Sequence, residues 1–135
     1  MMKIIILFWM SLFLYSSTKI DYINLSSILI KDGYFKRATK SLNKVDIEEN
    51  NFNFSQYYTL KGLAYKGLGY PDISNLFLAE AIKRGQKNKS IHLYMAKNYW
   101  DLQEYNKTIL SMKLAGKQAK QKANLFIILA EAYKK

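Results

Sequence analysis

The feature that most constrains the fold of this chain is a pattern of residue types that recurs every 34 positions. Residues 55–88 and 89–122 carry similar side chains in the same order. The matched pairs are Tyr58 and His92, Gly62 and Ala96, Tyr65 and Tyr99, Leu68 and Leu102, Ser74 and Thr108, Leu78 and Met112, and Ala81 and Ala115. A fixed period of this length is typical of proteins built from stacked structural repeats.

The pattern extends in both directions. The same spacing leads from the second copy to Phe126, Ala130 and Tyr133, close to the last residue. Towards the N-terminus, Gly33 and Ala38 match Gly69 and Ser74 with an offset of 36, because the connection 46–54 is two residues longer. The sequence therefore predicts three full units, at about 19–54, 55–88 and 89–122, followed by a terminal half-unit, 123–135.

Within each unit, apolar residues at helical spacing flank a short turn, which predicts two helices. The fold class is therefore expected to be all-α, an α-solenoid of antiparallel helix pairs with a capping helix at the C-terminus. About 117 residues are enough for one domain and too few for two. The expected helices are 22–30, 34–44, 56–67, one that Pro71 opens and Gly85 ends, 91–101, 104–116 and 124–134.

These residues resemble the tetratricopeptide repeat family, whose unit is a 34-residue helix–turn–helix with small side chains where its helices touch. The matching positions are the small residues Gly62, Ala96 and Ala130, the aromatic residues Tyr65, Tyr99 and Tyr133, and the later small residues Ala38, Ser74, Thr108, Ala81 and Ala115. Three features depart from the family pattern. Lys61 replaces an apolar residue, Val45 replaces an alanine, and no unit ends in proline.

The resemblance implies a concave groove, lined by the first helix of each pair, that binds another protein or a peptide. By register, its lining would be Ile20, Ile23, Ser27, Ile30, Thr59, Leu63, Lys66, Leu93, Lys97, Trp100, Ile127 and Glu131. Trp100 beside Lys97 would suit a binding anchor, and ordinary packing between units is the alternative role for Trp100. A clamp for a chaperone's terminal carboxylate is not expected, because the corresponding positions hold Ile23, Ser27, Leu60, Ser90 and Tyr94, none of them cationic.

Residues 1–18 differ from the rest of the chain. A lysine at position 3 precedes a twelve-residue apolar run, 4–15, which contains a single serine. This pattern is typical of a secretory signal peptide, and the run is shorter than the roughly 20 residues of a spanning helix. We expect a signal peptide or an N-terminal membrane anchor, and hence an exported protein that is periplasmic or membrane-associated in a bacterial envelope. A buried first helix is the alternative.

The chain is strongly basic, with a formal net charge of +11. Three clusters lie on or after the second helices of the units: Lys36, Arg37, Lys40 and Lys44; Lys83, Arg84, Lys87 and Lys89; and Lys113, Lys117, Lys120 and Lys122. In register they would form a stripe that attracts anionic lipid. A solvated lysine-rich surface is the alternative, and nucleic acid would suit only a cytoplasmic protein.

No residue pattern indicates catalysis. The chain has no cysteine, and its one histidine, His92, occupies a packing position. Asp46, Glu48 and Glu49 lack the spacing of a calcium loop, and the glycines do not form a phosphate loop. We therefore expect a non-enzymatic protein without cofactor or metal. An accessory subunit of an envelope complex and self-association through the apolar last helix stay open.

Overall fold

The structure is a computed structural model that describes residues 19–116 and 120–134. These residues form seven helices, which confirms the all-α prediction: α2 (Tyr22–Lys31), α3 (Phe35–Leu42), α4 (Phe54–Gly67), α5 (Pro71–Lys83), α6 (Ser90–Asp101), α7 (Tyr105–Ala115) and α8 (Lys120–Tyr133). The largest difference from the predicted ends is in α8, which begins at Lys120 rather than Asn124. The residues before Asn124 are good helix formers that do not interrupt the helix.

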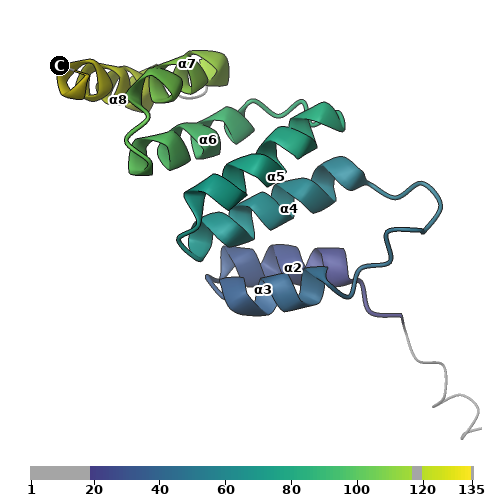
Figure 1. The fold of residues 1–135 in the computed structure, drawn as a ribbon. Helices are drawn as coiled ribbons and strands as arrows, with labels where there is room; N and C mark the ends of the chain where they lie inside the picture. The colour runs from purple at the N-terminus through teal and green to yellow at the C-terminus, as the bar shows by residue number, and fades with distance from the viewer. Residues whose placement is uncertain (1–18, 117–119, 135) are drawn as a thin grey trace, which may run out of the picture.

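The helices pack in consecutive pairs that follow one another along the molecule (Figure 1). The pairs are α2 with α3, α4 with α5, and α6 with α7, while α8 packs against α7. The first helices also touch each other, α2 against α4 and α4 against α6. This arrangement is that of a small helical repeat array, with α2, α4 and α6 joined in one layer.

Local sequence explains where several helices begin. The side chain of Asp21 accepts a hydrogen bond of 3.0 Å from the backbone N–H of Asn24, and Asn53 does the same for Gln56. Each bond satisfies a backbone donor that has no partner inside the first helical turn. Pro71 is the first residue of α5, as predicted, because its missing N–H would have no helical partner there.

The core is divided among the pairs rather than gathered at one centre. One buried cluster joins α3 to α4, a second joins α5 to α6, and a third joins α6 to α7. Their buried members are Ala38, Leu42, Tyr57, Leu60 and Ala64; Leu78, Ala81 and Ile91; and Ala96, Met112 and Ala115. Each pair therefore depends for its burial on its neighbours in the stack.

Lys61, which departs from the apolar pattern, is half-buried among aromatic rings. Its Nζ lies 4.8 Å from the ring centroid of Phe77 and 5.1 Å from that of Tyr57. Its carbon stem can pack as an apolar residue would, while the ammonium group is attracted by the ring faces. The lysine is thus compatible with a packing position.

Residues 1–18, for which a signal peptide or anchor is predicted, lie outside the described residues. Among the described helices, none combines the length and the hydropathy needed to cross a bilayer.

Candidate functional site

The residues predicted to line a groove lie on α2, α4, α6 and α8, except Ile20, which precedes α2, and the structure places them at different depths. The half-buried ones are Ile23, Ile30, Thr59, Leu63, Lys66, Leu93, Trp100 and Ile127, and the exposed ones are Ile20, Ser27, Lys97 and Glu131. The predicted groove residues therefore offer both apolar and charged groups to solvent.

Four of the apolar members also contribute to the core. Ile23 and Ile30 pack against the cluster that joins α3 to α4. Leu93 and Ile127 pack against the cluster that joins α6 to α7. Because these side chains are shared between the core and the surface, substituting them would affect folding as well as binding. Exposed members such as Lys97 are better probes of binding.

Thr59, a predicted groove residue in the first half of α4, is hydrogen-bonded to the connection that follows α5. Its Oγ1 donates a hydrogen bond of 2.7 Å to the carbonyl of Ser55 and accepts one of 3.2 Å from Nε2 of Gln86. A polar link of this kind fixes the connection beside the first-helix layer.

Trp100 lies where α6, α7 and α8 meet. Its ring makes edge-on contacts with Tyr105, at a centroid distance of 5.3 Å, and with Tyr133, at 5.6 Å. Such pairs are worth about 0.5–1.5 kcal/mol each beyond burial. These contacts are those expected of the packing alternative, and the anchor role of Trp100 stays a prediction.

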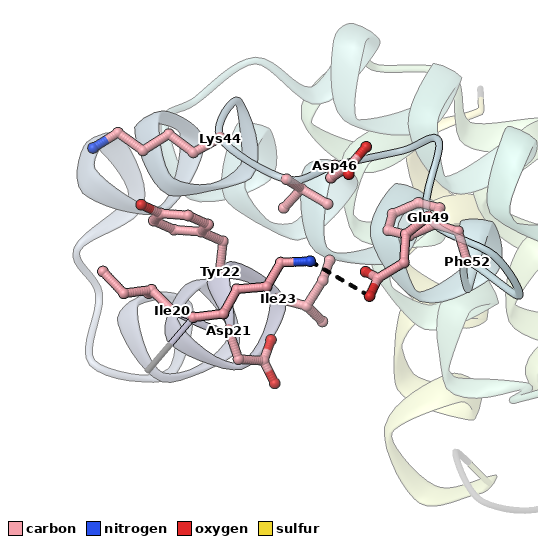
Figure 2. A pocket seen from close by; sticks show the side chains of 10 residues that line it. Ile20, Asp21, Tyr22, Ile23, Lys44, Asp46, Glu49 and Phe52 are labelled. Carbon is pink, nitrogen blue, oxygen red and sulfur yellow. Dashed lines mark ion pairs between the residues drawn. The ribbon is translucent and has the colours of Figure 1, made fainter. Parts of the chain in front are cut away.

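A hollow of about 310 Å³ lies beside the start of α2, next to the loop that follows α3 (Figure 2). Ile23, Val45 and Phe52 supply apolar lining, and the Nζ of Lys19 lies 3.6 Å from a carboxylate oxygen of Glu49. The sequence predicts that Glu49 lies in the connection 46–54, but no residue pattern indicates that this connection packs beside α2. Among the described residues, no group of three His, Asp or Glu side chains is arranged to hold a metal ion.

A second hollow, of about 350 Å³, lies between the turn after α6 and the end of α8. Glu104, Lys107 and Tyr133 are among its lining residues, and Glu104 forms an ion pair with Lys107. A third hollow, of about 210 Å³, opens between α2 and α3 and is lined by several cations.

The basic clusters are exposed wherever the structure describes their side chains. Lys36, Arg37, Lys40, Lys44, Lys83, Lys87, Lys89 and Lys113 are exposed. Arg84 forms an ion pair with Glu80, with Nε 2.8 Å from the carboxylate oxygen. The side chains of Lys117, Lys120 and Lys122 lie outside the described part of the chain, so the stripe is described only in part.

His92 is half-buried at the predicted packing position on α6. Burial lowers the pKa of its imidazole, and the nearby charge of Lys89 lowers it further. The neutral form is therefore favoured in the folded protein.

Known proteins give no identification of this site. No protein-family model matches the chain, and no curated protein or solved structure matches it.

Proposed function

We propose that the protein is a non-enzymatic scaffold that holds a segment of another protein along the layer formed by α2, α4 and α6. The observation that carries the proposal is the contact of these first helices in succession, α2 with α4 and α4 with α6. Stacked helix pairs present an extended surface of this kind, which other helical-repeat proteins use for binding.

Membership of the tetratricopeptide repeat family is part of this proposal. It is supported by the 34-residue period and by the tight contacts at the small positions. Ala96 and Ala130 are fully buried, and a side chain added at Gly62 would collide with Leu78.

We further propose that the protein works in a bacterial cell envelope. The support is the sequence of residues 1–18, in which a short cationic start precedes an apolar run of signal-peptide length. Fractionation of cells that make the full chain tests this location, and recovery in the cytosol alone would contradict it.

Charge reversal on the first-helix layer tests the binding proposal. Lys66 on α4 and Lys97 on α6 are predicted groove residues, so Lys66→Glu with Lys97→Glu places two negative charges on that layer. The matched control, Lys87→Glu with Lys113→Glu, makes the same change of net charge at exposed positions elsewhere. Capture from envelope extract, with mass spectrometry and then titration of the captured protein, measures the effect.

We expect the groove variant to weaken binding of the captured protein at least about tenfold, and the control to leave it nearly unchanged, because only the groove variant alters the contact surface. Equal weakening by both variants would indicate a general charge effect and would contradict the groove. Circular dichroism of both variants checks that the helices are intact.

A further inference from the structure

The first helix pair has a hollow that combines an apolar floor with a cationic rim. It lies between α2 and α3, with a volume of about 210 Å³, and its lining is Tyr22, Leu25, Leu29, Arg37, Lys40, Ser41 and Lys44. Leu25 is 38% exposed, and Ile28, one helical turn further along α2, is 49% exposed. Apolar side chains therefore reach solvent directly beside the cations.

The positive charge at this hollow is not neutralised by carboxylates. Within the described part of the chain, Arg37, Lys40 and Lys44 have no ion-pair partner, and the lining contains no acidic residue. Lys44 Nζ lies 5.7 Å from the centroid of Tyr22 and the Arg37 guanidinium 5.5 Å from that of Tyr34. Such contacts orient the cations but leave their charge in place.

The corresponding face of the second pair is filled. With the offset of 36, Ser41 corresponds to Phe77 and Tyr22 to Tyr58. The ring of Phe77 lies 6.2 Å from that of Tyr58 and 5.4 Å from that of Tyr65, and it occupies the space between the helices. In the first pair the small Ser41 instead turns its hydroxyl to the carbonyl of Tyr22, at 3.2 Å. The hollow is thus open in the first pair and filled in the second.

The charge at this face differs between the pairs as well. Lys44 of the first pair corresponds to Glu80 of the second, and Glu80 binds Arg84 at 2.8 Å. At this position the second pair therefore carries a carboxylate that neutralises a neighbouring cation, whereas the first pair carries an additional cation.

We infer that this α2–α3 face, made of Tyr22, Leu25, Ile28, Leu29, Arg37, Lys40 and Lys44, docks on an anionic lipid surface. The three cations would meet lipid phosphates, and the aliphatic side chains would lie at the boundary of the acyl chains. Surfaces with basic and apolar residues side by side bind membranes in this way. The face shares α2 with the proposed protein-binding layer but contains none of the predicted groove residues, so either proposal can fail without the other.

Two observations favour a lipid surface over a compact ligand. A volume of about 210 Å³ is below the roughly 300–1,000 Å³ of pockets for small molecules. Arg37 and Lys40 lie one turn apart on α3, and Lys44 follows two residues after its end; all three line the hollow, which suits a repeating anionic surface. The apolar run 4–15 precedes α2 closely in sequence, so a chain anchored by it would hold α2 near the head groups.

Flotation of the full chain with lipid vesicles tests the inference. The vesicles are phosphatidylcholine alone, or the same lipid with about 30% phosphatidylglycerol, and the quantity measured is the gain in binding that the anionic lipid gives. The test variant is Arg37→Gln, Lys40→Gln, Lys44→Gln, and the control of equal charge is Lys83→Gln, Lys87→Gln, Lys113→Gln, whose positions are all exposed. Residues 1–18 are the same in both variants, so their contribution cancels when the two variants are compared.

We expect the test variant to lower the anion-dependent gain at least about tenfold and the control to lower it less than about threefold. A second readout is local: Ile28→Trp should give a blue-shifted fluorescence increment on anionic vesicles, while Leu76→Trp on α5 should not. Equal losses in the two charge variants, no anion-dependent gain, or binding to soluble polyglutamate without binding to vesicles would each overturn the inference.

Discussion

Gly62 shows how a single missing side chain sets the distance between two helices. It is buried in α4, and a Cβ built there would lie 2.5 Å from Cδ2 of Leu78 and 3.2 Å from the carbonyl oxygen of Ser74. Leu78 is fully buried, so its side chain is surrounded by other protein atoms. Steric overlap here competes with the better helix propensity of alanine.

We expect Gly62→Ala to destabilise the protein by about 1–3 kcal/mol, because overpacking outweighs a propensity gain of about 1 kcal/mol. Urea denaturation measures this change. The control is the same substitution in a Leu78→Ala background, where the colliding atoms are gone and Gly62→Ala should be neutral or stabilising. The same loss in both backgrounds would contradict the steric explanation.

His92 links stability to pH. Its pKa is lowered from the ordinary value of 6.5, chiefly by burial and then by the charge of Lys89. The unfolded chain therefore binds this proton at a higher pH than the folded chain, and folding stability falls as the pH drops through about 6.5. It is the only histidine of the sequence, so few other groups titrate in this range.

We expect the urea concentration at the unfolding midpoint to decrease when the pH is lowered from about 7.5 to about 5.5. The decrease should be much smaller in the His92→Gln variant than in the unchanged protein. Denaturation curves of both proteins at several pH values measure this difference. Identical slopes in the two proteins would show that the imidazole does not carry the effect.

At the scale of the element, the turn between the two helices of the third unit has a strained backbone, because a residue other than glycine occupies its left-handed position. Gly33 and Gly69 end their helices with φ of 81° and 84°, and Gln103 holds the corresponding place with φ of 59°. A side chain in this left-handed region costs about 1–2 kcal/mol, whereas glycine adopts it freely.

We therefore expect Gln103→Gly to stabilise the protein by roughly 0.5–1 kcal/mol, since relief of strain exceeds the extra entropy that glycine has in the unfolded chain. Thermal denaturation of the two proteins measures this change in stability. Lys97→Gly, at an exposed position inside α6, is the control and should destabilise. A loss of stability in Gln103→Gly would contradict the strain.

A buried polar network joins α5 to α6. Asn98 donates to Ser74 Oγ at 2.8 Å and to Asn75 Oδ1 at 2.9 Å, and Ser74 donates to the carbonyl of Gly62 at 2.7 Å. Asn98 Oδ1 and Asn75 Nδ2 have no protein partner. The hydrogen bonds of this network therefore fix how α6 is oriented against α5, although two buried polar atoms remain unsatisfied.

We expect Ser74→Ala to destabilise by about 1–3 kcal/mol, because it removes a donor and an acceptor in a buried network. A double-mutant cycle with Asn98→Ala should give a coupling of about 0.5–3 kcal/mol, read from urea denaturation of the four proteins. Additive effects would show that the two residues do not act together.

At the scale of the molecule, contacts run mainly between neighbouring helices, so stability should vary along the stack. The pair of α4 and α5 has neighbours on both sides, whereas α8 leaves Ile128 65% and Tyr133 62% exposed. Repeat arrays of this kind are stabilised by the interfaces between neighbours.

We expect amide hydrogen exchange to be slowest in α4 and α5 and fastest in α8, because local opening costs least where few apolar contacts are lost. Exchange measured by mass spectrometry on peptides from each pair tests the order. Uniform protection from α2 to α8 would mean that the molecule unfolds as one unit.

The sequence by itself determined the number and order of the helices and their pairing, because each unit repeats its own apolar spacing, turn glycine and small contact residues. It also placed Pro71 at a helix start. Only the tertiary structure decided which side chains meet between units. Trp100 contacts Tyr133, and Ser41 leaves open a hollow that Phe77 closes in the next pair. The physical reason is that such contacts depend on the volumes that two helices bring to one place, which no spacing within either helix records.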